Sequence, residues 1–386
     1  MTGVGSQRSA LDRLARDYGL KHEIVGVSEI DKYAIASYQA IHGETHNFGD
    51  ITKIDQLPYA DLWTYSFPCT DISLAGKQQG LQHANKRNNG LLGLLDLEYD
   101  NQPIKATRSG LLYEVERLLI KAVESNTQPK FLLLENVKAL VSQKFEDDFY
   151  GWLDELSQLG YNNYWKVLNA KDYGIPQNRE RVFVVSIHKS VDNGQFRFPQ
   201  RFPLTKRLKD LLEQQVDEKY YITQEKLAAI SGWKAQQDPI ENMEKMDKTG
   251  VASTLTARGA GEEHSGMILI KEATKQGYAL AQDGDGVYLD RPYQKRGVVQ
   301  KGMIQTLKTS GDDVGVVVGD HQKMKVRKLS PRECYRLMNF TDEQFDRASS
   351  VCSNSQLYRQ AGNSIVVAVL EHIFTELFIR SGIQWE

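Results

Sequence analysis

One cysteine of this sequence is placed like a nucleophile. Cys69 follows Ser66-Phe67-Pro68 at the end of a strand predicted over residues 61–67, and a glycine-containing loop comes after it. A thiolate at the point where a strand gives way to a loop can attack an electrophilic carbon. A lone cysteine is more often a small buried hydrophobic residue, so this position alone leaves both interpretations open. For Cys334 and Cys352 the packing interpretation is the better one.

A carboxylate and two arginines lie at the ends of other apolar strands. Glu135 follows the apolar stretch 130–134, and burial of its charge is costly unless it has a partner or a function. Arg179 and Arg181 lie at the start of a strand predicted over 181–187, and alternation places both on one side. Two guanidinium groups on one face can hold a carboxylate, a phosphate or the edge of a base. A cap or salt bridge for Glu135, and a solvated strand start for the arginines, are the alternatives.

The first residues of the chain suit a nucleotide-like cofactor. Gly3-Val4-Gly5 is a short glycine turn before a helical segment, where backbone N–H groups can approach a ligand. Glu29 ends the next predicted strand, at a place where a carboxylate can bind ribose hydroxyls. A bare Gly-x-Gly is a weak signal, and it gains weight from Glu29.

Composition is that of an ordinary globular enzyme. The 386 residues are 40% hydrophobic and 25% charged, with a net charge of −2, which suits a large α/β domain and a smaller one. Because the total charge is near zero, any nucleic-acid signal must come from local clusters. The three cysteines indicate a reducing compartment, and no apolar run approaches the roughly 18 residues that span a membrane. We expect a cytoplasmic monomer with no membrane contact.

The elements that must position these residues alternate between strand and helix. Strands are predicted over 23–27, 61–67, 130–134, 165–168 and 181–187. Helices are predicted over 31–41, 110–123 and 145–159, and a last helix begins after Gly362-Asn363-Ser364 and runs through Ile373. Alternation of this kind predicts an α/β fold with a doubly wound, mostly parallel sheet. Ligands of such sheets bind at the carboxyl ends of the strands.

The sequence changes character after residue 188. Residues 190–325 lack regular alternation, and two similar stretches within them, 253–269 and 305–318, suggest a weak repeat of β-hairpins. Helical signal returns at Ser330, which forms a capping-box pattern with Glu333. The predicted domains are a catalytic and cofactor-binding domain over 1–188, a strand-rich domain over 189–325, and a segment over 326–386 that returns to the catalytic domain.

Together these motifs resemble the cytosine-C5 DNA methyltransferase family, in the family's own order and across nearly the whole chain. Phe67-Pro68-Cys69 looks like the nucleophile motif, and Glu135-Asn136-Val137 and Gln177-x-Arg179-x-Arg181 look like the motifs that grip the cytosine. The segments 327–334 and 360–364 are similar to the two late motifs. The cofactor-binding residues implied by the resemblance are Gly3, Gly5, Glu29, Ile30, Asp50, Ile51, Pro68, Asn363 and Ser364.

The resemblance implies a fold, a cofactor and a mechanism. The fold is a Rossmann-like methyltransferase sheet with a smaller target-recognition domain, and the cofactor is S-adenosyl-L-methionine. Cys69 would add to C6 of the cytosine, while Glu135 protonates or hydrogen-bonds N3. Arg181 would hold O2, and Arg179 would support it. Because a stacked base is out of reach, the cytosine must leave the duplex, which costs roughly a few kcal/mol.

DNA contact is expected from local basic groups. In this family the segment after the nucleophile closes on DNA, and a basic group at 323–332 is a second candidate. Phosphate contacts would make binding dependent on salt, although a solvated charged face is about equally expected for each group. A Thr-Leu pair of the recognition domain lies near the flipped base in the family; Thr306-Leu307 is the better match and Thr254-Leu255 the rival. The candidate DNA-binding residues are Lys77, Lys86, Arg87, Thr306, Leu307 and Lys325.

Three features depart from the family pattern. No strand precedes the glycine turn, Thr70 stands where many members have Gln, and the stretch 83–106 is longer than usual. We expect the missing strand to leave its neighbours without ladder partners, and to lower stability and cofactor affinity.

Two other functions are alternatives to sequence-specific methylation of double-stranded DNA. They are methylation of transfer RNA at cytosine C5 and a catalytically silent DNA-binding role. The long segment 190–325 favours DNA, because such a domain can read base edges in a groove. The presence of Cys69, Glu135 and Arg181 favours an enzyme, which would act alone or beside a cognate restriction endonuclease.

Overall fold

The computed structural model describes residues 3–67, 111–231, 267–291, 294–295, 297–319 and 324–384. Contacts between residues divide the chain into two compact units. The first unit comprises Met1–Asn169, Glu180–Gln200 and Val369–Glu386, and the second comprises Ala170–Arg179 and Arg201–Ala368. The predicted boundaries at 188 and 325 differ from these limits, since residues 326–368 group with the second unit.

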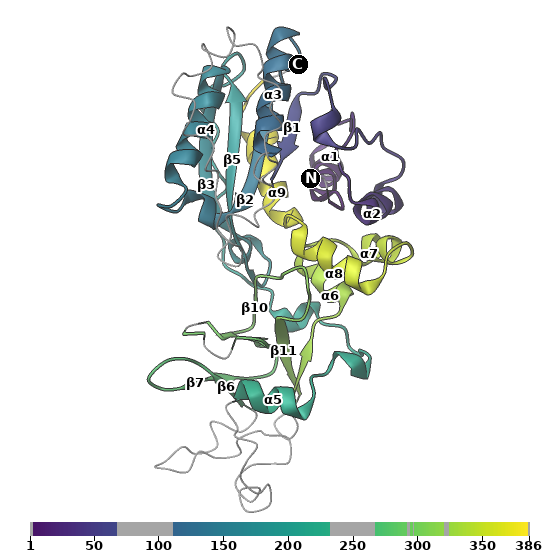
Figure 1. Cartoon of the computed structure of the whole chain (residues 1–386), viewed down its shortest axis with the longest axis vertical. Coiled ribbons are helices and arrows are strands. Elements are labelled where there is room, and N and C mark those ends of the chain that lie inside the picture. Colours follow the sequence, from purple (N-terminus) through teal and green to yellow (C-terminus); the bar gives the residue numbers. More distant parts are fainter. Residues whose placement is uncertain are drawn as a thin grey trace, which may run out of the picture. The chain divides into compact units, whose positions relative to one another are not determined.

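A four-stranded sheet with the order β1-β2-β5-β3 forms the centre of the first unit (Figure 1). Its strands are β1 (Leu62–Tyr65), β2 (Phe131–Val137), β5 (Glu180–His188) and β3 (Tyr161–Asn169). The α/β class is confirmed. Where the sequence predicted mostly parallel strands, the described part of the sheet is mixed, because β1 runs parallel to β2 while β2–β5 and β5–β3 are antiparallel. Antiparallel neighbours need no crossover helix, and residues 170–179 between β3 and β5 form only a 3₁₀ turn and the short strand β4 (Gln177–Asn178).

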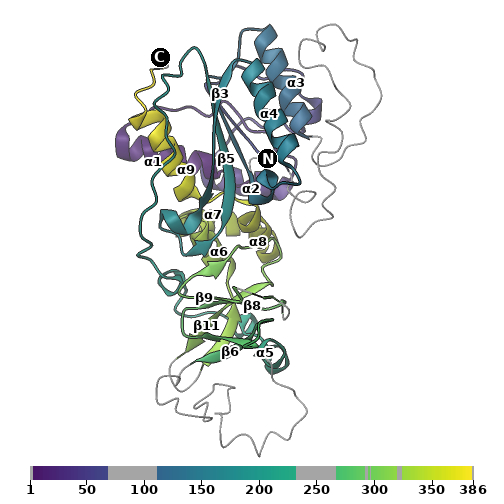
Figure 2. The ribbon, with the colours of Figure 1, turned by 90° about the vertical axis from the view of Figure 1, so that its left-hand side faces the viewer.

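Helices cover both faces of this sheet. Figure 2 shows α3 and α4 on one side of β5 and β3, and α9 on the other side. Each helix buries one apolar stripe against the sheet or a neighbouring helix, as amphipathic helices of globular proteins do. The helices of the first unit are α1 (Ser6–Tyr18), α2 (Lys32–His42), α3 (Leu111–Glu124), α4 (Glu146–Gln158) and, extending from the second unit, α9 (Val367–Phe374).

Most elements predicted in the first half of the chain are present. Helices α2, α3 and α4 and strands β1, β2, β3 and β5 lie within a few residues of their predicted limits. The strand predicted over 23–27 is wrong, because Val27 forms only an isolated bridge, with Asn47, in the described part of the chain. A strand needs a neighbour for its N–H and C=O groups. Among the described residues, β1 likewise has a ladder partner, β2, on one side only.

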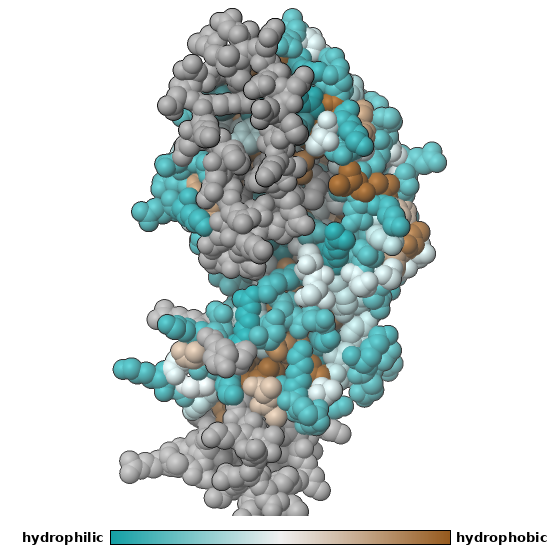
Figure 3. All heavy atoms as spheres, viewed as in Figure 1, coloured by the Kyte–Doolittle hydropathy of each residue, from teal (hydrophilic) through white to brown (hydrophobic). Residues whose placement is uncertain are grey.

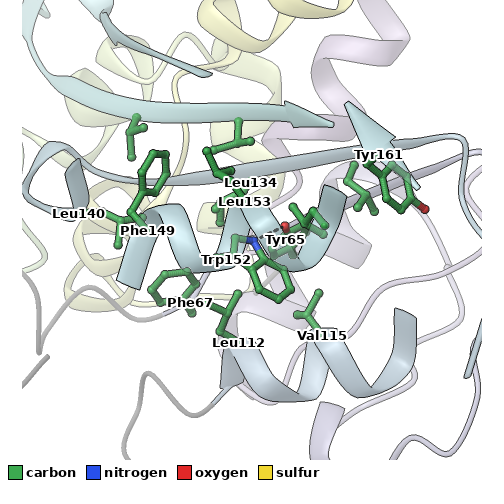
Figure 4. Close-up of a cluster of buried hydrophobic side chains, with 14 of the residues drawn as sticks. Tyr65, Phe67, Leu112, Val115, Leu134, Leu140, Phe149, Trp152, Leu153 and Tyr161 are labelled. Carbon is green, nitrogen blue, oxygen red and sulfur yellow. Dashed lines mark hydrogen bonds between the residues drawn. The ribbon is translucent and has the colours of Figure 1, made fainter. Parts of the chain in front are cut away.

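The core of the first unit packs between the sheet and helices α3 and α4 (Figure 4). Tyr65 and Leu134 from the sheet meet Phe149 and Trp152 from α4. The indole Nε1–H of Trp152 donates to the Tyr65 hydroxyl at 3.1 Å. Burial raises the pKa of Tyr65, so its hydroxyl stays protonated and neutral. Because a buried polar group is costly without a partner, this bond fixes α4 against β1.

Short strands dominate the middle of the second unit. An antiparallel sheet has the order β12-β11-β8-β9, and a separate hairpin joins β6 to β7. Helix α5 (Gln224–Ser231) packs on this core through Leu227 and Ile230. The strands are β6 (Ile268–Lys271), β7 (Tyr278–Ala281), β8 (Gly286–Tyr288), β9 (Val299–Gln300), β11 (Val314–Gly319) and β12 (Met324–Lys328).

The β-hairpin predicted over 305–318 is wrong. Strand β10 (Ile304–Gln305) pairs in parallel with β4 (Gln177–Asn178), whereas β11 pairs with β8 and β12. Similar composition therefore does not specify strand pairing, since a hairpin requires a register that Thr and Gly residues do not set. The other expected strand, at 253–256, lies outside the described residues.

Three helices follow the strands of the second unit: α6 (Pro331–Leu337), α7 (Asp342–Ser349) and α8 (Asn354–Asn363). The predicted capping box is confirmed, because Ser330 and Glu333 each accept from the other's backbone N–H. Cys334 is buried in α6, as predicted for a packing residue, and burial raises the pKa of its thiol. Short 3₁₀ turns occur at Ile51–Lys53, Lys138–Val141, Ala170–Tyr173, Leu208–Leu211 and Glu218–Tyr220, and Thr375–Arg380 is a π-helix.

One helical stretch, Asn354–Arg380, is long and apolar enough to cross a membrane by length and composition. Its most apolar window has a mean hydropathy of 1.4, and 61% of that window is buried inside the protein. Residues 364–366 also interrupt the stretch between α8 and α9. Burial and interruption are typical of core helices, and the described surface in Figure 3 is mostly hydrophilic.

Candidate active site

Strand β2 carries two polar residues that point to opposite faces of the sheet. Glu135 and Asn136 are 8% and 3% exposed. The sequence placed Glu135 at a strand end, but β2 continues to Val137, so Glu135 lies within the strand. Because successive side chains of a strand alternate, one polar group serves each face.

Glu135 forms an ion pair with Arg181 on the neighbouring strand β5. In the antiparallel register Val137 lies opposite Arg181, so Glu135 shares its face and reaches it diagonally. Arg181 Nε lies 3.2 Å from Glu135 Oε1, and both side chains are mostly buried. A carboxyl group beside a guanidinium can match the edge of a nucleobase, since one group can donate or accept while the other only donates.

Asn136 ties the segment before Cys69 to β2. Its Nδ2–H donates to the backbone oxygen of Phe67 at 3.2 Å, and its Oδ1 accepts from Val137 N at 2.8 Å. Pro68 and Cys69 themselves lie outside the described residues. Asn136 is thus a functional candidate to which the motifs alone assigned no separate role; the signal was a polar residue inside an apolar strand.

Arg179 binds three backbone carbonyls of the second unit. Its Nη1 donates to Leu307 O at 3.2 Å, and its Nη2 donates to Gly362 O and Ser364 O, both at 2.9 Å. The side chain of nearby Gln177 accepts from Leu307 N at 3.4 Å. Since Arg179 is only 3% exposed, its planar guanidinium acts here as a clamp between segments distant in the sequence.

The two arginines predicted to share one strand face serve different units. Strand β5 begins at Glu180, so Arg179 precedes it and belongs to the second unit, whereas Arg181 belongs to the first. The prediction was wrong because alternation applies only along one continuous ladder, and the short strand β4 before Arg179 pairs with β10 instead.

Thr306 and Leu307 lie in the loop after β10 that Arg179 contacts, and both side chains have contacts of their own. The Thr306 hydroxyl donates to Asn178 O at 2.7 Å, and Leu307 is 4% exposed. The adjacent Lys308 is half-exposed and lies 3.1 Å from the buried carboxylate of Asp313. These contacts give the pair a supporting role in the loop, while the rival pair at 254–255 lies outside the described residues.

The glycine turn and Glu29 meet in the first unit. Gly3 N donates to Glu29 Oε2 at 3.0 Å, and Glu29 Oε1 accepts from the backbone N–H groups of Ile30 and Asp31 at 3.0 and 3.1 Å. Among the residues that the structure describes, none has an atom within 4 Å of a Cβ placed at Gly3, and Ile30 is 73% exposed. Open backbone, a buried carboxylate and an exposed aliphatic side chain thus lie close together in this part of the unit.

Gly5 lacks a side chain for a different reason. It has φ 85°, and a Cβ there would lie 2.5 Å from His42 Nε2 and 2.8 Å from the Tyr38 ring. Its bare Cα therefore makes room for protein side chains.

Asp50 and Ile51 have structural contacts of their own. Asp50 caps the turn that follows it by accepting from Thr52 N at 3.0 Å, and hydrogen bonds from Thr52 lower the pKa of Asp50. Ile51 packs against the core of the first unit, and its carbonyl accepts from Arg117 at 3.2 Å. Asp50 therefore keeps a charged, accessible carboxylate, whereas Ile51 joins the turn to the core.

The basic group at 323–332 is partly internal. Arg327 makes two hydrogen bonds to Glu333, at 2.7 and 2.8 Å, and both side chains are at most 2% exposed. Arg327 is therefore a structural residue, which corrects its assignment to a DNA-binding cluster. Lys325 is 43% exposed and lies 4.7 Å from the centre of the Tyr221 ring. Three further candidates, Lys77, Lys86 and Arg87, lie outside the described residues.

The sequence profile of one protein family matches nearly the whole chain. It is described as C-5 cytosine-specific DNA methylase, and it matches residues 1–92 and 100–379. The chain belongs to this family. Membership confirms the predicted enzyme class, a methyltransferase that acts on C5 of cytosine in DNA.

Individual methylases are similar to this one along most of their length. The orphan methyltransferase M.SPBetaI of Bacillus phage SPbeta is 33% identical, over 97% of this chain and 96% of that protein. The type II methyltransferase M2.ScrFI of Lactococcus lactis subsp. cremoris is also 33% identical, over 97% of each chain. The crystal structure of the S. pombe Dnmt2 methyltransferase matches with a TM-score of 0.56 at 18% identity, over 97% of this chain and 95% of that one, which confirms the fold.

Proposed function

We propose that this methylase modifies cytosine within a specific sequence of double-stranded DNA, through a transient covalent bond between Cys69 and C6 of the base. The observation that carries the proposal is the buried pair of Glu135 and Arg181. A carboxyl group that can donate to N3 and a guanidinium that can donate to O2 together complement one edge of cytosine. Extrusion of the base from the duplex would be required to bring that edge to them.

Each catalytic residue has a distinct role in this proposal. The thiolate of Cys69 adds to C6, which moves electron density to C5. Glu135 donates to N3 and Arg181 to O2, so both stabilise the negative charge that develops in the ring. Once C5 carries the methyl group that the cofactor would supply, loss of the C5 proton to solvent restores the C5–C6 double bond as the bond between C6 and Cys69 breaks. We assign Arg179 the support of the Thr306–Leu307 loop, because its donors bind backbone carbonyls.

The first unit offers groups that fit S-adenosylmethionine. Glu29 is a suitable acceptor for ribose hydroxyls, Ile30 offers an exposed apolar surface for the base, and Asp50 adds a second carboxylate. The cavity lined by Gly3 and Glu29 is only about 10 Å³, room for one water molecule, so the nucleoside must use the exposed surface. When bound, the cofactor supplies an electrophilic methyl group on its sulfonium. The further residues of the first unit proposed for this site are Gly5, Ile51 and Pro68; Asn363 and Ser364, which the family resemblance also implies, belong to the second unit.

We propose DNA contacts for the loop 306–308 and for Lys77, Lys86, Arg87 and Lys325. Each phosphate contact releases counterions, so the affinity for DNA should fall as the salt concentration rises. We also propose that the protein acts in the cytoplasm as a monomer, alone or beside a restriction endonuclease. The relatives described as an orphan and as a type II methyltransferase support either arrangement.

Transfer of labelled methyl groups to double-stranded DNA and to transfer RNA tests the substrate and the nucleophile. Cys69→Ser should abolish transfer to DNA while binding of DNA persists, and Cys352→Ser, at a half-buried thiol, serves as the control. DNA that carries 5-fluorocytosine should trap a covalent adduct with the wild type and none with Cys69→Ser. Active enzyme that forms no adduct at Cys69 would refute the mechanism, and transfer to RNA alone would favour the RNA alternative.

A second variant tests the pair on β2 and β5. Glu135→Gln keeps the shape of the side chain but removes its acidic proton, so kcat should fall by about 10²- to 10⁴-fold while the Kd for DNA changes little. Glu180→Gln is the matched control, because Glu180 begins β5 but its side chain is exposed and pairs with Lys138 at 3.1 Å. A Glu135→Gln enzyme with unchanged kcat would exclude proton donation by Glu135.

A further inference from the structure

We propose that His42 is a positioning residue for the cofactor turn, Gly3-Val4-Gly5, and that it thereby sets the affinity for S-adenosylmethionine. The inference rests on the proposed function of that turn. His42 is the last residue of helix α2 and lies outside every motif that the sequence pointed to.

Helix α2 and the residues before it hold the turn at two points. Glu29, which precedes α2, accepts from the N–H of Gly3 at 3.0 Å. At the opposite end of the helix, His42 Nε2 lies 3.1 Å from the carbonyl oxygen of Val4. One N–H of the turn is thus tied to a residue just before α2 and one C=O to the last residue of α2, so the peptide groups between them cannot rotate without breaking a hydrogen bond.

A carboxylate of helix α1 lies near the imidazole of His42. Since the carbonyl of Val4 can only accept, Nε2 must carry a proton, and Nδ1 then faces Asp12, whose Oδ2 lies 3.9 Å away. The other oxygen of Asp12 accepts from His22 Nε2 at 2.9 Å. Asp12 belongs to α1, the helix that the turn leads into. Its distance from Nδ1 is that of an ion pair, so Asp12 attracts the ring when Nδ1 also carries a proton.

Close packing leaves the imidazole little freedom. The His42 side chain is 3% exposed, and its ring centroid lies 4.8 Å from that of Tyr38. Only glycine at position 5 leaves room for Nε2, because a Cβ there would lie 2.5 Å from it. A turn that is ordered before binding loses less conformational entropy when the cofactor arrives, so its affinity is higher.

Calorimetric binding of S-adenosylmethionine to the full chain tests the inference. His42→Leu removes the donor to Val4, and we expect its Kd to rise about tenfold, the effect of one hydrogen bond. His42→Gln places an amide N–H near the position of Nε2, and its Kd should stay within about threefold of the wild type. On DNA, KM for the cofactor should follow Kd, while kcat at saturating cofactor changes less than about twofold.

His188 provides a matched control in the same unit. Its ring also packs against a glycine with positive φ, Gly160, where a Cβ would lie 3.0 Å from Nε2. Its Nδ1 interacts with the Ser190 hydroxyl at 2.7 Å, so His188→Leu should leave the Kd for the cofactor unchanged. If His42→Leu fails to fold, Asp12→Asn provides the test instead. The Asp12 carboxylate is 48% exposed, and its loss should raise the Kd for S-adenosylmethionine about threefold.

Three outcomes would overturn the inference, and they differ in what else they refute. A His42→Leu chain that binds the cofactor as the wild type does would refute the positioning role alone. A His42→Gln chain as weak as His42→Leu would show that ring packing, and not the hydrogen bond to Val4, is what matters. A folded wild-type chain that binds no S-adenosylmethionine would refute the proposed function together with this inference.

Discussion

Replacement of Arg179 by lysine should destabilise the second unit although it keeps the positive charge. The guanidinium reaches three carbonyls with two nitrogen atoms, at 3.2 Å for Leu307 and 2.9 Å for Gly362 and Ser364. Lysine places all of its donors on a single nitrogen, so it cannot span carbonyls that lie on two separate segments. We expect the ammonium group of the Arg179→Lys variant to satisfy one segment and leave the other without its donor.

The size of the effect follows from burial. The hydrogen bonds to Leu307 and Ser364 are fully buried, and Arg179 itself is 3% exposed, so water cannot replace a lost donor. A buried carbonyl left without a partner costs about 1–3 kcal/mol, and imperfect pairing of the ammonium adds to this. Arg179→Lys should therefore lower the free energy of unfolding by about 2–5 kcal/mol.

Urea unfolding followed by circular dichroism measures this loss, and hydrogen exchange of peptides over 304–309 and 361–366 shows where it acts. Arg201→Lys is the control, because Arg201 lies in the same unit, its side chain is 66% exposed, and it pairs with Asp172 at 3.3 Å. That change should cost less than about 0.5 kcal/mol. If Arg179→Lys is no more destabilising than Arg201→Lys, or if exchange increases elsewhere but not in these two peptides, the clamp has no energetic role.

Three further predictions concern stability. Glu333→Gln leaves the buried Arg327 without its counter-charge, and urea unfolding should show a loss of about 3–5 kcal/mol; a loss below about 1 kcal/mol would contradict this. Gly362→Ala puts a Cβ 2.6 Å from the backbone of the loop after β10, so the melting temperature should fall and an unchanged value would refute the close approach. Arg336 lowers the pKa of Asp342 from 3.8, so their pair stabilises the fold fully above pH 3.8 and its contribution is lost as the pH falls through the lowered pKa. Asp342→Asn should thus be destabilising at pH 7, by at most about 1 kcal/mol at this exposed site, and its effect should shrink as the pH falls below the lowered pKa of Asp342.

The helices and strands that carry the site could be predicted because each has its own periodicity. Helix α3 has apolar residues at helical spacing, and β5 is apolar from Val182 to Ile187 except for the buried Ser186, as expected of a strand covered on both faces. The strand predicted over 23–27 failed because a strand also needs a neighbour, and no local pattern specifies whether that neighbour is present.

The candidate residues could be identified from the motifs, but their partners could not. Gly3 and Gly5 look equivalent in the sequence, yet among the described residues none would meet a Cβ at Gly3, while Gly5 makes room for His42. Asn136 stands in a motif without a role of its own, and its contact with Phe67 depends on the parallel pairing of β1 with β2. Contacts of this kind arise from register and packing, which short motifs do not encode.

By itself the sequence determined the family, the enzyme class and the order of the residues that could do its chemistry. The tertiary structure decided which of them meet. Glu135 reaches Arg181 because an antiparallel register sets β2 against β5, while Arg179, two residues away, turns to carbonyls far along the chain. The physical reason is that residue type fixes what a side chain can donate or accept, whereas its partner is fixed by how distant segments pair and pack.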